Sequence, residues 1–256
     1  MASVDLNADL GEGDGSAGLL RDLEILQQIS SANVACGGHA GSLERMRQLA
    51  VACQELGVAF GAHPSFCDRE GFGRSRPTAI PADLQQQLQQ QLQSALTAAA
   101  AVGIAVHHVK PHGALYHVIE HDPLIADLFL AAVQQVLPGV RIVGISGGRL
   151  VRRAAEQGWT TVQEFFADRE YEADGRLRER HLESSVVTDH EQICHRALIA
   201  VREGQVNCFG GGLISVTAET ICVHGDHADS VAAATALRRA LEQSGIRISS
   251  AEGPEC

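Results

Sequence analysis

The sequence almost entirely lacks lysine. Of its 20 basic residues 19 are arginine, and the single lysine, Lys110, lies in the segment HHVKPHG (107–113). Arginine is permanently charged, whereas the lysine ammonium is compact and its pKa responds strongly to its surroundings. A lysine that occurs once, at the end of an apolar run and among histidines, is more typical of a functional site than of a solvated surface. We therefore predict a functional role for Lys110.

Long apolar runs and a basic stripe are missing as well. No run of 18 apolar residues could span a bilayer, and Asp5 and Asp9 interrupt the apolar stretch nearest the N-terminus, which argues against a secretory signal. The formal net charge of -11 argues against a nucleic-acid surface, because such a surface needs basic residues to displace counterions from phosphates. We expect a cytoplasmic protein that binds neither membranes nor nucleic acid.

The motifs that usually hold zinc or a nucleotide are also missing. The seven cysteines are widely spaced and never form C-x-x-C, so we expect reduced thiols rather than disulfides or a thiolate zinc site. Residues 13–18 match G-x-G-x-x-G, but Glu12 and Asp14 would repel a pyrophosphate, and we interpret these glycines as a tight turn. The sequence contains no G-x-x-x-x-G-K-[ST] motif.

Short apolar runs alternate with longer helical patterns, which is typical of repeated βα units around a parallel sheet. Seven such units predict an α/β fold: a single-domain, irregular, seven-stranded β/α barrel over residues 1–250, with a flexible tail over 251–256. A charged segment, 166–188, is predicted to be an active-site loop or lid, and 205–219 a β-hairpin. The expected strands are 3–9, 32–36, 58–62, 105–110, 140–145, 160–165 and 220–224, and the expected helices are 18–29, 42–56, 81–102, 122–137, 147–157, 189–204 and 227–244.

Polar residues follow six of these seven strands. Because the carboxyl ends of parallel strands meet at one face of a barrel, we expect these side chains to form a site there. A single one of them could simply cap the following helix, but coincidence across six strands is harder to explain that way. They are Asn7, Asp9 and Glu12; His39; His63; Lys110 and His112; Glu164, Asp168 and Arg169; and His224 and Asp226.

This combination of residue types is compatible with two kinds of chemistry. Carboxylates beside histidines suit general acid/base catalysis, or a metal held by mixed oxygen and nitrogen ligands, for which Asp9, His39 and His63 are candidates. No spacing in the sequence fixes a metal, so none is assigned. Arg74 could bind a carboxylate or form a surface ion pair, and we favour a structural ion pair for Asp168 and Arg169.

Six segments, found in order along nearly the whole chain, resemble the lactam utilisation family, which is also called the family of 5-oxoprolinase A subunits. They are DLNADLGEG (5–13), SANVACGGHAG (31–41), GAHPSFCDREGFGR (61–74), HVKPHGALYH (108–117), EFFADREYEADGRL (164–177) and ICVHGDH (221–227). The sequence departs from the family pattern at Gly38, at Cys67 and over 178–184, which affects the expected shape of the pocket and the behaviour of the lid.

The resemblance implies a β/α barrel related to the glycoside hydrolases and deacetylases. It also implies an enzyme subunit that, with subunits B and C, opens 5-oxoproline to glutamate with ATP as co-substrate. In this interpretation Lys110 holds the substrate carboxylate or polarises the lactam oxygen, and His112 and Asp9 act as acid and base. The expected substrate-binding residues are Asn7, Glu12, His39, His63, Arg74, Tyr116, Asp168, His224 and Asp226.

Two alternatives stay open at this point. One is a free-standing, metal-dependent deacetylase or amidohydrolase that uses Asp9, His39 and His63 as ligands. The other is a non-catalytic subunit whose barrel mouth binds a small carboxylate.

Overall fold

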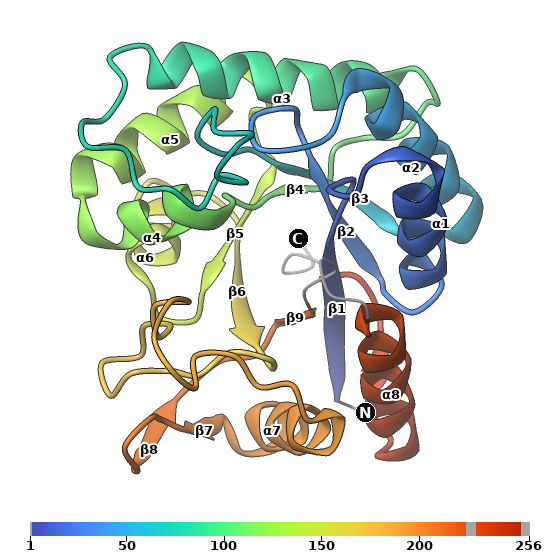
Figure 1. Ribbon diagram of the computed structural model, residues 1–256, viewed down its shortest axis with the longest axis vertical. Helices are drawn as coiled ribbons and strands as arrows, with labels where there is room; N and C mark the ends of the chain where they lie inside the picture. Colours follow the sequence, from blue (N-terminus) through green and yellow to red (C-terminus); the bar gives the residue numbers. More distant parts are fainter. Residues whose placement is uncertain (1, 224–228, 252–256) are drawn as a thin grey trace.

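The strands form a closed parallel barrel in the computed structural model, which describes residues 2–223 and 229–251. β1 pairs with both β2 and β9, and β6 also pairs with β9, so the ring has no open edge (Figure 1). The predicted seven-stranded β/α barrel is confirmed. Its strands are β1 (Ser3–Leu10), β2 (Ser31–Ala35), β3 (Ala59–His63), β4 (His108–Val109), β5 (Arg141–Ile145), β6 (Thr161–Phe166) and β9 (Thr220–Val223).

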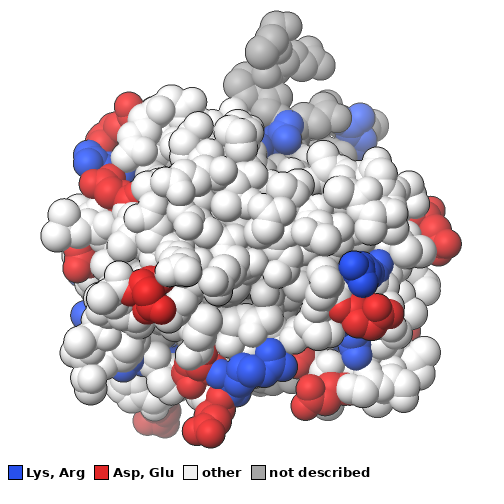
Figure 2. All heavy atoms as spheres, turned by 90° about the horizontal axis from the view of Figure 1, so that it is seen from above, with Lys and Arg blue, Asp and Glu red and all other residues white. Residues whose placement is uncertain are grey.

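Eight helices in the described part of the chain surround this ring. They bury apolar stripes against the strands, as α3 does with Leu84, Leu88 and Leu92, each 0% exposed. α3 contains no charged residue. It lies at the top of Figure 1, and Figure 2, which views the molecule from that side, shows almost no charged residue at the centre of this face. None of these helices is both long and apolar enough to cross a membrane. They are α1 (Gly15–Leu26), α2 (Leu43–Leu56), α3 (Leu84–Ala100), α4 (Gly113–His121), α5 (Pro123–Val136), α6 (Arg149–Glu156), α7 (His190–Glu203) and α8 (Ser230–Gln243).

The structure differs from the sequence-based prediction at three elements. The strand expected over 105–110 is only the two residues of β4, and the short helix α4, which follows at once, was not predicted. A further strand, β10 (Arg247–Ile248), pairs with the start of β1 outside the ring. The expected hairpin is confirmed as β7 (Gln205–Asn207) and β8 (Leu213–Ser215).

Between β6 and α7 the chain forms no helix and only two isolated β-bridges, so segment 166–188 is a long loop as predicted. The single-domain boundary at residue 250 stays a prediction. Of the expected tail, residues 252–256 lie outside the described residues.

The glycine-rich turn before α1 owes its composition to close backbone contact. A Cβ atom added at Gly18 would lie 2.5 Å from the carbonyl carbon and oxygen of Gly13. Gly15 has a φ of +60° but nothing within 4 Å of an added Cβ. These contacts support the interpretation of the G-x-G-x-x-G match as turn geometry.

We expect Gly18→Ala to lower the free energy of unfolding by about 1–3 kcal/mol, since the added methyl group forces the two backbone segments apart. Gly15→Asn is the matched control, and its loss should stay below about 1 kcal/mol because asparagine tolerates the left-handed conformation. Urea unfolding followed by circular dichroism measures both values. Equal losses in the two variants would contradict the steric explanation.

Candidate active site

The alternation of side chains along β1 places three polar residues inside the barrel. Successive residues of a strand point to opposite faces, so Asp5, Asn7 and Asp9 share one face while Leu6 and Ala8 share the other. All five are buried. The barrel interior is therefore lined by polar groups, and the apolar residues of this strand face the helices.

Asn33 of β2 joins these groups across the barrel. Its Nδ2 donates to Asn7 Oδ1 at 2.7 Å and to Asp9 Oδ1 at 2.9 Å, and its Oδ1 lies 2.7 Å from His108 Nε2. His108 fits there because its neighbour on β3 is Gly61, where a Cβ atom would collide with the imidazole ring. The side-chain amide of Asn33 thereby holds the Asp9 carboxylate in a fixed orientation.

Lys110 enters the same interior from the end of β4 and is 1% exposed. Its Nζ lies 2.7 Å from Glu164 Oε1, 2.9 Å from Asp9 Oδ1 and 3.2 Å from Cys222 Sγ. Burial opposes the charged form, but the carboxylates of Asp9 and Glu164 outweigh it and raise the pKa of Lys110 well above its ordinary value. The ammonium is thus charged at neutral pH and bridges two walls of the barrel.

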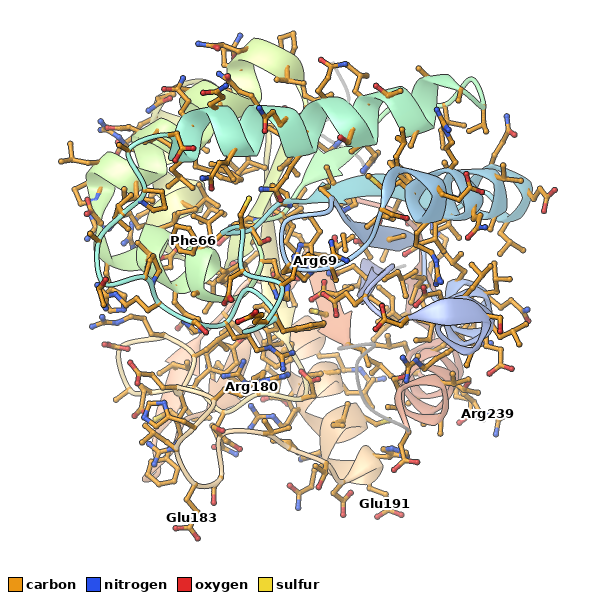
Figure 3. The ribbon with its side chains drawn as sticks, turned by 45° about the horizontal axis from the view of Figure 1, so that its top comes forward. Phe66, Arg69, Arg180, Glu183, Glu191 and Arg239 are labelled. Carbon is orange, nitrogen blue, oxygen red and sulfur yellow. The ribbon has the colours of Figure 1, made fainter. Side chains whose placement is uncertain are left out.

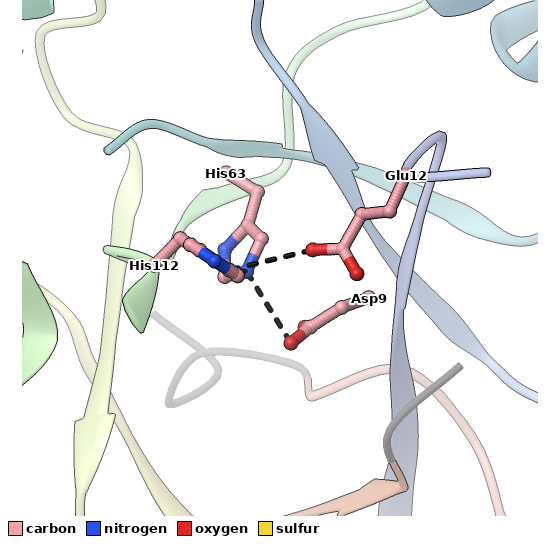
Figure 4. A group of neighbouring side chains, drawn as sticks. All are labelled: Asp9, Glu12, His63 and His112. Atoms are coloured by element: carbon pink, nitrogen blue, oxygen red, sulfur yellow. Dashed lines mark hydrogen bonds and ion pairs between the residues drawn. The ribbon is translucent and has the colours of Figure 1, made fainter. Parts of the chain in front are cut away.

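Four of the polar strand-end residues converge beside this ammonium (Figure 4). His63 Nε2 lies 3.0 Å from His112 Nδ1 and 3.3 Å from Asp9 Oδ2, and His112 Nδ1 lies 3.3 Å from Glu12 Oε1. One ligand atom from each of Asp9, Glu12, His63 and His112 falls within 4.8 Å of all the others. These four residues could hold a metal ion, and we call them the four-residue cluster.

Backbone carbonyl groups fix the orientation of both imidazoles in this cluster. His63 Nδ1 donates to the carbonyl of Lys110 at 2.8 Å, and His112 Nε2 donates to the carbonyl of Phe72 at 2.9 Å. Phe72 has a φ of 54°, in the left-handed region that bulky residues rarely adopt, and its conformation aims this carbonyl at His112. Burial, followed by the neighbouring His39 and His63, holds the pKa of His112 well below its usual value.

His39 lies beside the cluster rather than in it. Its ring stacks on that of His112 with 3.6 Å between centroids, its Nε2 lies 3.0 Å from Glu12 Oε1, and its Nδ1 lies 2.9 Å from Ser65 Oγ. Burial, followed by the nearby His63, lowers the pKa of His39 to about 2. His39 therefore orients Glu12, and the group that converges differs from the Asp9, His39 and His63 set considered from the sequence.

A cavity of about 700 Å³ opens above the cluster. Asp9, His63, Lys110 and His112 lie at its inner end, and Tyr116, whose hydroxyl donates to Glu164 Oε2 at 3.0 Å, forms part of its wall. Figure 3 shows Arg180 directed toward the interior, whereas Glu183 of the same loop points away. The arginines that line the cavity are Arg74, Arg76, Arg169, Arg176 and Arg180.

Arg169 also holds the long loop together. It is 4% exposed, its Nε donates to the carbonyl of Ser185 at 3.1 Å, and its Nη2 donates to the carbonyl of Arg178 at 2.6 Å. Burial, followed by the nearby Arg180, lowers the pKa of Arg169 to about 10. Its neighbour Asp168 is buried as well, at 6% exposed. These contacts indicate a structural role for Arg169.

The structure joins most of the predicted site residues in one connected group. Seven of them form one continuous series of contacts, and two more line the cavity. The seven are Asn7, Lys110, Asp9, His63, His112, Glu12 and His39, and the two are Arg74 and Tyr116. His224 and Asp226 lie outside the described residues. Three residues of this group were not predicted to have a specific role in the site. Asn33 and His108 occupy inward positions of predicted strands, and Glu164 was expected at the end of a strand.

Comparisons with known proteins agree on one family. The pattern of the LamB/YcsF family matches residues 4–255. The A subunit of 5-oxoprolinase from Chloroflexus aggregans is 42% identical over 248 residues, which cover 97% of this chain and 98% of that protein. The crystal structure of the lactam utilization protein from Thermus thermophilus is 38% identical, with a TM-score of 0.88 over 96% of this chain and 99% of that one.

We expect stability to fall with acidification below pH 6.5. Buried histidines whose pKa is lowered, such as His39, His108 and His112, stay neutral in the folded state but take up protons in the unfolded chain. Their contribution is therefore complete above about pH 6.5 and is lost below it, by about 1.4 kcal/mol per pH unit for each histidine.

Urea unfolding at pH 7.5, 6.5 and 5.5 measures this dependence. His108→Gln removes one such histidine, so its slope below pH 6.5 should be shallower by about 1.4 kcal/mol per pH unit. His181→Gln, a change at an exposed position, is the control and should keep the slope of the unchanged protein. A slope that is the same in all three proteins would refute the assignment.

Proposed function

The chain belongs to the LamB/YcsF family, and we propose that it is a subunit of an ATP-dependent 5-oxoprolinase. In this proposal it opens the lactam of 5-oxo-L-proline to L-glutamate, with hydrolysis of ATP to ADP and phosphate, together with subunits B and C. The observation that carries the proposal is the 42% identity, over nearly the full length of both chains, to a protein named as the A subunit of 5-oxoprolinase.

The cavity supports an anionic substrate. Arg74 and Arg180 line it, and a guanidinium binds carboxylates and phosphates through paired hydrogen bonds. 5-Oxoproline carries one carboxylate, and phosphorylation of its lactam oxygen would add a second anionic group. The same arginines suit both the substrate and such an activated form.

The contacts of Lys110 favour a role different from the two expected for it. Its ammonium is already paired with Asp9 and Glu164, so we assign to it the orientation of these carboxylates at the inner end of the cavity rather than the capture of the substrate carboxylate. In the proposed reaction Asp9 and His112 accept and return the protons of the attacking water and the leaving nitrogen. ATP is a co-substrate of the assembled enzyme.

One observation favours a second candidate function. The convergence of Asp9, Glu12, His63 and His112 suits an amidohydrolase that uses a metal and acts without ATP or partners. Release of ADP and glutamate from 5-oxoproline, with each of the three subunits omitted in turn, separates the two candidates. Turnover only in the complete mixture supports the 5-oxoprolinase, whereas turnover by this chain alone supports the amidohydrolase.

We expect Lys110→Met to abolish glutamate release in the three-subunit assay, because Asp9 and Glu164 lose the charge that orients them. The same change should lower the free energy of unfolding by about 3–5 kcal/mol, since it leaves buried carboxylates unpaired. Arg239→Met is the control: it removes one positive charge from an exposed position of α8, which Figure 3 shows pointing outward, and should preserve both activity and stability.

The assay is carried out at a temperature at which circular dichroism shows the Lys110→Met protein to be folded. Near-normal turnover by this folded variant would contradict the role of Lys110. Turnover that persists with altered affinity for 5-oxoproline would point instead to a ligand-binding subunit.

A further inference from the structure

The two imidazoles of the four-residue cluster turn toward each other the ring nitrogens that do not face backbone carbonyls. A backbone carbonyl can only accept a hydrogen bond, so the nitrogens that face Lys110 O and Phe72 O, His63 Nδ1 and His112 Nε2, both carry hydrogens. In neutral rings the opposite nitrogens, His63 Nε2 and His112 Nδ1, then present lone pairs, and these two atoms are only 3.0 Å apart. Two lone pairs at this distance repel unless a cation lies between them.

Carboxylate oxygens surround the same point. Asp9 Oδ2 lies 3.3 Å from His63 Nε2, while Asp9 Oδ1 accepts hydrogen bonds from Lys110 and Asn33, so the carboxylate is fixed with one oxygen toward the histidines. Glu12 Oε1 lies 3.3 Å from His112 Nδ1 and is held by His39. Each of the four candidate metal ligands thus has a second contact that orients its side chain, as is typical of ligands in protein metal sites.

Three of the six separations among these atoms match those of ligands around one ion, and all four atoms lie within 4.8 Å of one another. Metal bonds to imidazole nitrogen and carboxylate oxygen are about 2.0–2.2 Å long, which places neighbouring ligand atoms about 3.0 Å apart at right angles and about 3.4 Å apart in a tetrahedron. The three measured separations are 3.0, 3.3 and 3.3 Å. A shared proton would bridge only one pair of these atoms, whereas one metal ion can contact all four.

We propose that Asp9, Glu12, His63 and His112 bind one divalent first-row transition-metal ion at the inner end of the cavity. Two nitrogens and two carboxylate oxygens suit Zn²⁺ or Mn²⁺ better than Mg²⁺ or Ca²⁺, which prefer oxygen ligands alone. The cluster borders the cavity, so a carbonyl oxygen of a bound substrate could reach the ion. The proposal goes beyond the 5-oxoprolinase assignment and does not depend on it. With an ion bound, Asp9 and His112 would act as its ligands rather than as the free base and acid of that assignment.

Calorimetric titration of the tag-free full-length chain with Zn²⁺ and with Mn²⁺, after removal of metal with a chelator, tests this site. Cys67, an exposed thiol, is replaced by serine in every sample to suppress adventitious zinc binding. We expect one equivalent of metal to bind, with affinity at least about tenfold lower in His112→Gln and in Glu12→Gln. Anomalous scattering at the metal absorption edge should place the ion among the four side chains.

His117→Gln is the matched control, because His117 lines the same cavity but does not belong to the cluster. This variant should bind metal as the parent protein does. Metal-free circular dichroism and urea unfolding establish that each variant is folded, and two separate ligand variants allow for the failure of one. The proposal is overturned if the parent binds neither ion, if both ligand variants bind like the parent, or if His117→Gln weakens binding equally.

The two proposals fail in different ways. Metal binding is measured without lactam, ATP or partner subunits, so an inactive three-subunit mixture leaves that result unchanged. Full 5-oxoproline turnover by protein that binds neither ion would overturn the metal site and leave the proposed function in place.

Discussion

The pairing of one ammonium with two carboxylates inside a closed barrel is the constraint on which the site depends. Asp9 on β1 and Glu164 on β6 are both buried, and either charge would be strongly unfavourable there without a partner. Lys110, at the end of β4, contacts both and thereby ties three walls of the ring together. The orientation of Asp9 follows from this ion pair together with the hydrogen bond from Asn33.

The polar arrangement continues through the barrel interior toward the amino ends of the strands. At the opposite end Asp5 accepts hydrogen bonds from Ser31 at 2.7 Å and Thr220 at 2.5 Å, and Thr220 in turn accepts one from Asn7 at 2.6 Å. Apolar packing is left to the outward side chains of the strands and to the helices, as with Leu6 and the leucines of α3. The two requirements are thus separated in space: the outer layer supplies the hydrophobic stabilisation, and the inner layer fixes the polar groups of the site.

The sequence was sufficient to predict the ring and the face that carries the site, because apolar runs mark strands and the carboxyl ends of parallel strands must meet. It could not predict which polar residues touch. His39 and Glu12 both follow strands, yet only the three-dimensional packing directs Glu12 toward His112 and makes His39 its support. Asn33 looked like an ordinary strand residue, although the alternation of β1 and β2 would have placed it inside. The short helix α4 was not predicted because it begins at Gly113, within the KPHG segment that follows β4.

The same geometry explains why one lysine survives in a chain that otherwise uses arginine. The Lys110 ammonium is a compact group that contacts Asp9, Glu164 and Cys222 from a position only 1% exposed. A guanidinium is a planar fork that needs more room and binds best to groups lying in its own plane, whereas these partners approach from different strands. Five arginines line the cavity instead, where a planar guanidinium can bind a carboxylate or phosphate through paired hydrogen bonds. The choice between the two cations therefore follows from position: a point charge is needed inside the ring and broad anion-binding groups at its mouth.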